Sequence, residues 1–295
     1  MNTARKQTWF LSWVGLGWWA FAMLPTDAAQ PKVASTTEPN TLAATQRDSL
    51  IFLEKQKMAA PEKTLPSKTL AIAHSFLGTP YVGGTLDQNP TEQLVVNLRQ
   101  LDCWTLMENC LAIAQTGQGD FAAYQSHLRQ LRYRDGQVDG YGSRLHYFSE
   151  WLLQAEKNRH LRDLTKEMGG IPNKKTIGYI TARPTQYPQI KNAKVLREIK
   201  AAEQRINAHD WYFIPQSKVA AMEHLLKDGD LIMLTSAKPD LDIAHQGFAV
   251  RKNGRVHLLH ASSLAKKVIV SGQPLPQYVI SQKGQVGIMV ARLND

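Results

Sequence analysis

Two cysteines are the first residues in this chain that could do chemistry, and their surroundings differ. Cys103 follows Asp102, which can cap a helix that begins at Cys103. A cysteine in the first turn of a helix lies near unpaired backbone N–H groups and the positive end of the helix dipole, which favour the thiolate. Cys110 lies in the apolar middle of the same predicted helix, where a cysteine is usually a small buried hydrophobic residue. We therefore predict that Cys103 is a nucleophile and that Cys110 is structural.

The spacing of these cysteines argues against a disulfide bond between them. If both lie on one helix, the seven residues from Cys103 to Cys110 separate them by about 10 Å along its axis. A disulfide requires Cα atoms within about 7 Å of each other. We expect both thiols to be free.

The base that such a nucleophile needs is predicted from a hairpin. Asn253-Gly254 separates two β-like runs, which is a strong signal for a two-residue hairpin turn. With that turn, His245 and His260 project from the same face as diagonal neighbours, and His257 projects from the opposite face.

We predict that His245 is the general base and that His260 orients its ring. Gly247, opposite His260, would leave room for the contact because it has no side chain. Asp242 is an alternative orienting residue, but it lies outside the predicted strand. A core histidine with a satisfied hydrogen bond is the other interpretation of His260.

The start of the chain predicts export. Arg5 and Lys6 precede an uncharged apolar run from Trp9 to Leu24, and the small residues Ala28 and Ala29 follow. This order is typical of a signal peptide, here residues 1–29, and the run is short for a membrane span. An uncleaved anchor is the alternative. We expect a periplasmic or extracellular protein without stable membrane association after cleavage.

The charge of the chain indicates an anionic partner. Removal of residues 1–29 takes away two positive charges and one negative charge, so the formal charge falls from +10 to +9. A basic exported protein suits an anionic polymer such as the cell wall. No zinc-ligand spacing, helix-turn-helix pattern or basic arm with interleaved aromatic residues supports nucleic acid as the partner.

The order of the predicted elements indicates an α+β fold, with helices first and an antiparallel sheet second. A flexible leader is expected at 30–44 and a single catalytic domain at 45–295, in which about 116–210 form a helical insertion. The β-like runs are 176–181, 211–214, 230–234, 246–251, 255–260, 267–270 and 286–292.

An ordered set of motifs resembles the papain-like peptidoglycan cysteine hydrolases of the NlpC type. It consists of the loop Gly78-x-x-Tyr81-x-x-Gly84, the pair Asp102-Cys103 at a helix start, His245-x-Gly and His260-Ala-Ser, and it covers 67–115 and 228–292. The resemblance implies a papain-like core whose cysteine-bearing helix packs on the sheet. It also implies that the Tyr81 hydroxyl lies beside Cys103 and helps to bind the oxyanion or orient the substrate.

The stretch from Tyr133 to Tyr147 resembles one branch, the N-acetylmuramoyl-L-alanine amidase-like proteins. Within it Tyr141, Arg144 and His146 could line the substrate cleft, with Arg144 pairing with a peptide carboxylate, and Asp242 is a further candidate for substrate binding. Two departures from the family pattern stand next to the proposed catalytic residues: Gln246 replaces a small apolar residue, and Trp104 and Leu106 replace smaller residues.

Together these observations predict a monomeric cell-wall hydrolase that cuts the amide between N-acetylmuramic acid and L-Ala through a thioester on Cys103, without metal or cofactor. Its substrates would be peptidoglycan or muropeptide fragments. The nearest alternative is an endopeptidase that cuts between D-Glu and the diamino acid of the stem peptide. The alternative from another functional class is a catalytically silent protein that only binds the cell wall. A zinc amidase is disfavoured because no carboxylate stands at convincing ligand spacing to the histidines.

Overall fold

The computed structural model describes residues 40–295, which form one compact unit. The predicted signal peptide and most of the predicted leader therefore lie outside the described residues. Helix α1 (Asn40–Ala59) begins within the predicted leader, so residues 40–44 are helical rather than flexible. This stretch contains Leu42, Ala43 and Ala44, which are strong helix formers. None of the helices between residues 40 and 295 has the length and apolar character that a membrane-spanning helix needs.

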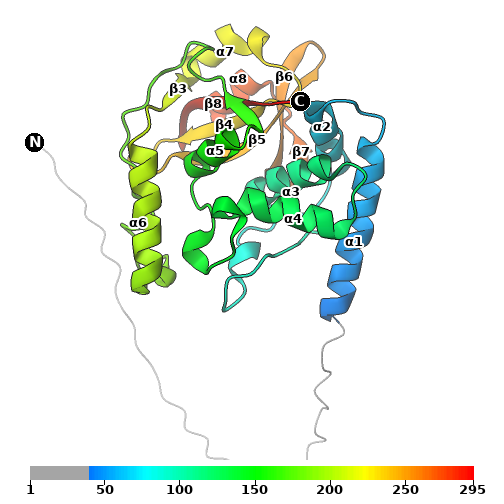
Figure 1. Cartoon of the computed structure of the whole chain (residues 1–295). Helices are drawn as coiled ribbons and strands as arrows, with labels where there is room; N and C mark the ends of the chain where they lie inside the picture. The colour runs from blue at the N-terminus through cyan, green and yellow to red at the C-terminus, as the bar shows by residue number, and fades with distance from the viewer. Residues whose placement is uncertain (1–39) are drawn as a thin grey trace, which may run out of the picture. The chain divides into compact units, whose positions relative to one another are not determined.

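A single antiparallel sheet runs through the middle of this unit (Figure 1). Its strand order is β2-β3-β8-β4-β5-β6-β7, and β1 also pairs with β8. The strands are β1 (Leu161–Asp163), β2 (Ile171–Pro172), β3 (Tyr212–Pro215), β4 (Leu231–Ser236), β5 (Ile243–Lys252), β6 (Arg255–Ser262), β7 (Lys267–Val270) and β8 (Gln285–Leu293). The predicted α+β class and antiparallel sheet are confirmed.

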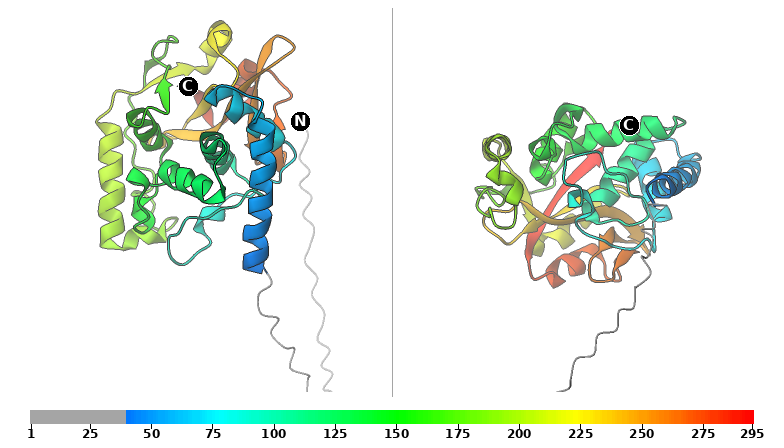
Figure 2. Two further views of the ribbon diagram at one scale, coloured as in Figure 1. Left: turned by 45° about the vertical axis from the view of Figure 1, so that its right-hand side comes forward. Right: turned by 90° about the horizontal axis from the view of Figure 1, so that it is seen from below.

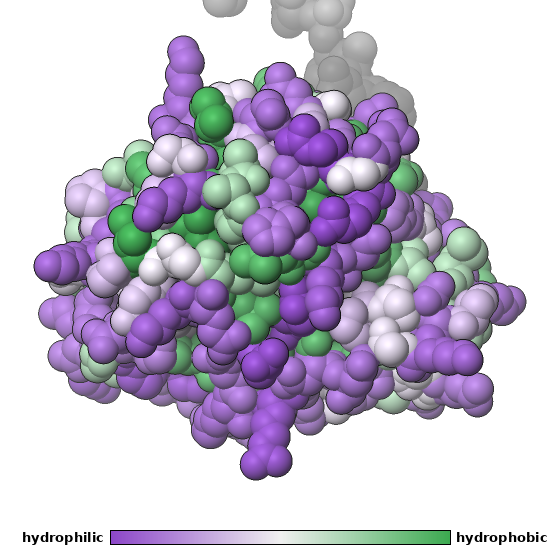
Figure 3. Space-filling view, turned by 90° about the horizontal axis from the view of Figure 1, so that it is seen from above, coloured by the Kyte–Doolittle hydropathy of each residue, from purple (hydrophilic) through white to green (hydrophobic). Residues whose placement is uncertain are grey.

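Helices cover both faces of the sheet (Figures 1 and 2). In addition to α1, they are α2 (Leu65–Ser75), α3 (Cys103–Thr116), α4 (Phe121–Arg132), α5 (Phe148–Lys157), α6 (Ala193–Asn207), α7 (Val219–Met222) and α8 (Leu275–Ser281). The larger core lies between the sheet and the helices α1 to α6, and a smaller core lies between the sheet and α7 and α8. The face seen from above is mainly hydrophilic, with small hydrophobic areas between polar ones (Figure 3).

Strand β5 shows why the sheet needs helices on both sides. Phe248 and Val250 enter the larger core, whereas Ala249 between them enters the smaller one. Successive side chains of a strand point to opposite faces of the sheet. A strand whose residues are all apolar is therefore buried on both faces. Strand β4 is buried along its whole length for the same reason.

The hairpin of β5 and β6 has the predicted register. Lys252 pairs with Arg255, so Asn253 and Gly254 form the two-residue turn. Both turn residues have positive φ, 52° and 78°, which asparagine and glycine tolerate better than other residues. The register that brings the two predicted histidines to one face is therefore set by the turn.

Two parts of the region 116–210 differ from the sequence prediction. This region contains α4, α5 and α6 but also β1 and β2, and Leu161 of β1 pairs with Leu293 of β8. Residues 176–181 form no strand. Two of their amides donate to side chains instead: Ile177 N–H to Asn207 Oδ1 and Ile180 N–H to the Tyr147 hydroxyl, both at 2.7 Å. A strand partner is therefore not required.

Candidate active site

Cys103 is the first residue of α3, and Asp102 caps this helix as predicted. The Asp102 carboxylate accepts a hydrogen bond from the Thr105 N–H at 2.8 Å, and the Thr105 hydroxyl accepts one from the Asp102 N–H at 2.9 Å. This reciprocal pair is a capping box, which fixes where the helix begins. Cys103 is half-buried and free, and Cys110 is buried and free, so the predicted absence of a disulfide is confirmed.

The resting protonation state of Cys103 differs from the expectation of a thiolate. Burial and the negative charge of Asp102 raise the pKa of the Cys103 thiol to about 12, while the backbone N–H groups of Gln246, Cys103 and Trp104 act in the opposite direction. The helix start does favour the thiolate, but desolvation outweighs it. The thiol is therefore protonated at neutral pH, and it would need a proton acceptor to act as a nucleophile.

Gln246 holds the start of α3 against the strand that carries His245. Its backbone N–H lies beside the sulfur, and its side-chain Nε2 donates to the Cys103 carbonyl oxygen at 3.4 Å. Because Gln246 directly follows His245, these contacts hold the start of α3, with Cys103, against the part of β5 that carries the predicted base. The other departure from the family pattern also has a structural role, since Trp104 packs edge-on against Phe148, with ring centroids 5.7 Å apart.

His245 and His260 are hydrogen-bonded to each other, as their predicted positions require. The distance from His245 Nε2 to His260 Nδ1 is 2.6 Å, and the two rings meet nearly at right angles. Gly247 makes this possible: a Cβ there would lie 2.9 Å from the Cβ of His260 and 2.5 Å from the carbonyl oxygen of Leu259. His257 lies on the other face and bonds to the Ser271 carbonyl oxygen at 2.8 Å through Nδ1.

Both histidines of this pair are neutral at neutral pH. Burial lowers the pKa of His245 to about 4, and burial together with the charge of His245 lowers the pKa of His260 to about 3. One proton lies between the two rings. If His245 Nε2 carries it, then His245 Nδ1 is free to accept a proton, and His260 carries its own proton on Nε2.

Tyr81 lies in the loop before the short 3-10 helix η1 (Thr85–Asp87), and its backbone N–H donates to the Lys266 carbonyl oxygen at 2.9 Å. Burial raises the pKa of the Tyr81 phenol, and the charges of Cys103 and Asp102 raise it further. The phenol is therefore within electrostatic reach of the sulfur. It remains neutral at neutral pH and can donate a hydrogen bond.

Tyr278, on α8, belongs to the same group of side chains but is not predicted from the sequence. Its ring centroid lies 5.2 Å from that of His260. Burial raises the pKa of the Tyr278 phenol to about 12, and the charge of Cys103 contributes to the shift. No sequence motif marks this tyrosine, since its place depends on how α8 packs on β6.

Tyr141, Arg144 and His146 cluster with one another and with the 85–95 loop. The rings of Tyr141 and His146 lie 4.2 Å apart, and the Arg144 guanidinium lies over the Tyr141 ring. Arg144 is buried and forms an ion pair with Asp87 and a longer one, of 3.7 Å, with Glu92. Its charge is therefore already balanced within the chain. In the part of the chain that the structure describes, the hydrogen bonds and ring contacts of these three residues do not reach Cys103 or the histidine pair.

Asp242 lies directly before β5, outside the strand as predicted. It is buried, and its carboxylate accepts a hydrogen bond of 2.8 Å from the Ser149 N–H in the first turn of α5. Desolvation raises the pKa of this carboxyl. Its contact connects the insertion to the β4–β5 loop, and the hydrogen-bond partner of the His245 ring is His260.

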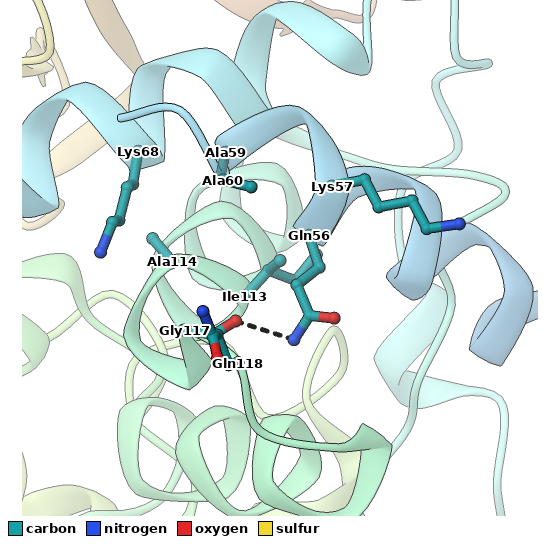
Figure 4. Close-up of a pocket in the computed structure, with 9 residues that line it drawn as sticks. All are labelled: Gln56, Lys57, Ala59, Ala60, Lys68, Ile113, Ala114, Gly117 and Gln118. Carbon is teal, nitrogen blue, oxygen red and sulfur yellow. Dashed lines mark hydrogen bonds between the residues drawn. The ribbon is translucent and has the colours of Figure 1, made fainter. Parts of the chain in front are cut away.

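Two cavities are relevant to the site. One, of about 440 Å³, is lined by residues that include His245, His260 and Tyr278. The other, of about 250 Å³, lies near the C-terminal end of α3 and is lined by Ile113, Ala114 and residues of α1 (Figure 4). No Cys or His side chain lines it. Among residues 40–295, no group of three or more His, Cys, Asp or Glu side chains could hold a metal ion.

Residues 71–288 match the protein family described as N-acetylmuramoyl-L-alanine amidase-like. The chain belongs to this family. The crystal structure of an N-acetylmuramoyl-L-alanine amidase from Bacteroides uniformis is similar to this chain at 35% identity and a TM-score of 0.74, with 78% of this chain and 99% of that one covered. The amidase-like branch inferred from residues 133–147 is therefore confirmed.

Two further solved structures are similar to this member of the amidase-like family. A candidate xylanase from Bacteroides fragilis is 35% identical, with a TM-score of 0.70 and coverage of 75% of this chain and 98% of that one. A protein from Legionella pneumophila is 20% identical, with a TM-score of 0.68 and coverage of 87% and 97%, and shares the fold. A comparison with curated proteins gave no match.

Proposed function

We propose that this chain is an N-acetylmuramoyl-L-alanine amidase that uses a cysteine–histidine mechanism on a papain-like core. The observation that carries the proposal is the constellation at the start of α3. A half-buried thiol lies beside the strand whose histidine is hydrogen-bonded to a second histidine. Nucleophile, base and orienting group are the three parts that covalent amide hydrolysis needs.

The protonation states suggest how the reaction runs. The Cys103 sulfur attacks the lactyl carbonyl carbon while its proton passes to His245 Nδ1, and the His245 imidazolium is stabilised through Nε2–H by His260. The Cys103 N–H and the Tyr81 hydroxyl are donors for the oxyanion. When the tetrahedral intermediate collapses, the C–N bond breaks and His245 returns the proton to the amine of L-Ala. Water then attacks the thioester, giving a free carboxylate and the thiol.

The wall formed by Tyr141, Arg144 and His146 is proposed to border the cleft. Because Arg144 is paired with Asp87, it acts by holding Tyr141 and the 85–95 loop rather than as a free cation. Replacement of Arg144 by alanine should raise KM more than it lowers kcat, as expected for a loss of uniform binding. Export through residues 1–29, a periplasmic or extracellular location and a monomeric state remain predictions.

Mass spectrometry of a muropeptide digest tests the reaction. The protein should release the whole stem peptide with a free L-Ala N-terminus, together with peptide-free sugar. Cys103→Ala should abolish this, whereas Cys110→Ala, which removes the other thiol, should retain it. The dipeptide L-Ala-D-Glu left on the sugar would instead establish the endopeptidase, and full activity of Cys103→Ala would disprove the mechanism.

A further inference from the structure

His260 lies on the face of the sheet that α8 covers. Successive residues of a strand alternate between the two faces, so His260 shares its face with Leu258, which belongs to the smaller core. Tyr278 of α8 also packs against this core. The rings of Tyr278 and His260 meet edge to face, with centroids 5.2 Å apart and planes at 63°, an arrangement that aromatic rings favour. The proposed catalytic steps give this contact no role.

The orientation of the His260 ring leaves one of its nitrogens unsatisfied. Nδ1 is hydrogen-bonded to His245 Nε2 at 2.6 Å, whereas Nε2 is fully buried and has no hydrogen-bond partner among the residues that the structure describes. Buried polar atoms normally have partners, and an unpaired one raises the free energy of this orientation. Other contacts must therefore hold the ring in place.

Partners for Nε2 would be available if the ring turned. His260 helps to line the cavity of about 440 Å³, which is large enough for water and has hydroxyl and amide side chains in its wall, among them Ser262, Ser281 and Gln282. In a ring turned into this cavity, both nitrogens could bond to water or to these groups. The same turn would break the hydrogen bond to His245.

Tyr278 borders the cavity into which the ring would turn, and it also contacts the ring. In the described part of the chain, the ring contacts of His260 are those with His245 and Tyr278. We propose that Tyr278 is a positioning residue: its ring blocks the turn of His260 into the cavity and keeps Nδ1 on His245 Nε2. This inference rests on the proposed function, in which His260 orients the base.

Three substitutions on α8 test this by kinetics on a soluble muropeptide. Tyr278→Phe keeps the ring and should keep kcat close to wild type. Tyr278→Leu keeps an apolar side chain but frees His260, so kcat should fall by about tenfold with KM nearly unchanged. The matched control is Val279→Ala, which removes buried volume from the smaller core. It should lower the melting temperature but leave kcat at the wild-type value.

A double substitution tests whether Tyr278 acts through His260. In the His260→Ala protein, Tyr278→Leu should cause no further loss of kcat, because two residues that act as one unit are not additive. A loss in Tyr278→Phe as large as that in Tyr278→Leu would assign the role to the hydroxyl. A similar loss in Val279→Ala would assign it to the packing of α8. Either result, or additive losses, overturns the inference.

Proton NMR separates this inference from the proposed function. The proton between the two buried imidazoles should exchange slowly and give a downfield signal in the Cys103→Ala protein, and its loss on adding His245→Ala assigns it. Adding Tyr278→Phe should retain the signal, and adding Tyr278→Leu should remove it. Absence of the signal in Cys103→Ala, or its persistence with Tyr278→Leu, would disprove the positioning role. Failure of the wild-type protein to hydrolyse muropeptides would disprove the amidase without affecting this measurement.

Discussion

At the scale of single residues, the site combines a thiol and two imidazoles that are all uncharged at rest. Burial is the main cause for each of them, since it raises the pKa of the Cys103 thiol and lowers the pKa of His245 and His260. In the proposed mechanism the thiolate–imidazolium pair therefore forms only during the attack. His245 would then stay unprotonated, and able to act as the base, over a wide range of pH.

The pH dependence of hydrolysis should show this directly. A base must be unprotonated, and a group whose pKa is lowered takes up its proton only at a more acidic pH. Because the pKa of His245 is about 4, kcat/KM should stay high on acidification and fall only near pH 4. The measurement is kcat/KM on a soluble muropeptide from pH 3 to 9, with circular dichroism at each pH to confirm folding. A fall centred near the ordinary histidine pKa of about 6.5 would contradict this.

The histidines of the β5–β6 hairpin allow a matched comparison. We expect His245→Ala to lower kcat/KM by about 10²- to 10⁴-fold, and His260→Ala to lower it by a smaller factor because His260 acts through His245. His260→Asn should recover part of the loss, since its side-chain oxygen can accept the Nε2–H. His257→Ala, on the opposite face of β6, should reduce the melting temperature through loss of its bond to Ser271 but leave kcat/KM near wild type. A severe kinetic loss at His257 alone would refute the assigned roles.

At the scale of elements, one side chain at the N-terminus of α3, that of Asp102, has two functions that can be separated. Asp102 caps the helix, and its charge raises the pKa of Cys103. Asparagine caps as well as aspartate but carries no charge. We therefore expect Asp102→Asn to keep the melting temperature and to move the pH profile of Cys103 alkylation to lower pH.

Asp102→Ala is the control for the capping function. It removes cap and charge together, so it should lose about 0.5–2 kcal/mol of unfolding free energy in addition to the shift in alkylation. Both variants are measured by denaturant unfolding and by the rate of iodoacetamide labelling. Equal stability of the two variants would show that the capping box is not needed.

Local signals explain why much of the site was predictable. The cap residue Asp102 and the turn Asn253-Gly254 act within a few residues, so the helix start and the hairpin register follow from the sequence. The contacts of Arg144 and Asp242 within the chain are not predictable in this way. Their partners, Asp87 and the Ser149 N–H, come from distant segments, and no local pattern encodes such contacts.

At the scale of the whole molecule, a buried ion pair joins the cysteine helix to the insertion. Arg132 of α4 and Glu108 of α3 meet at 2.8 Å, and their side chains are 1% and 0% exposed. Removing one partner leaves an uncompensated buried charge. We expect Glu108→Ala to lower the unfolding free energy by about 3–5 kcal/mol, measured by denaturant unfolding.

The exposed ion pair of Lys157 and Asp135 is the comparison for this prediction. Both side chains are largely exposed, and Asp135 has a positive φ of 48°, which asparagine tolerates. Asp135→Asn should therefore change stability little. If Asp135→Asn and Glu108→Ala lowered the unfolding free energy by similar amounts, burial would not be the reason for the large effect expected at Glu108.

The close approach of the Gly247 backbone to β6 has a consequence for the interpretation of a mutational screen. Any other residue there would put a Cβ within 2.9 Å of His260 and 2.5 Å of the Leu259 carbonyl oxygen, so the two imidazoles would separate. Substitutions of Gly247 would then lower activity as strongly as substitutions of the proposed nucleophile and base, although Gly247 has no reactive group. Gly247 matters because it lacks a side chain, and a search for reactive residue types would not find it.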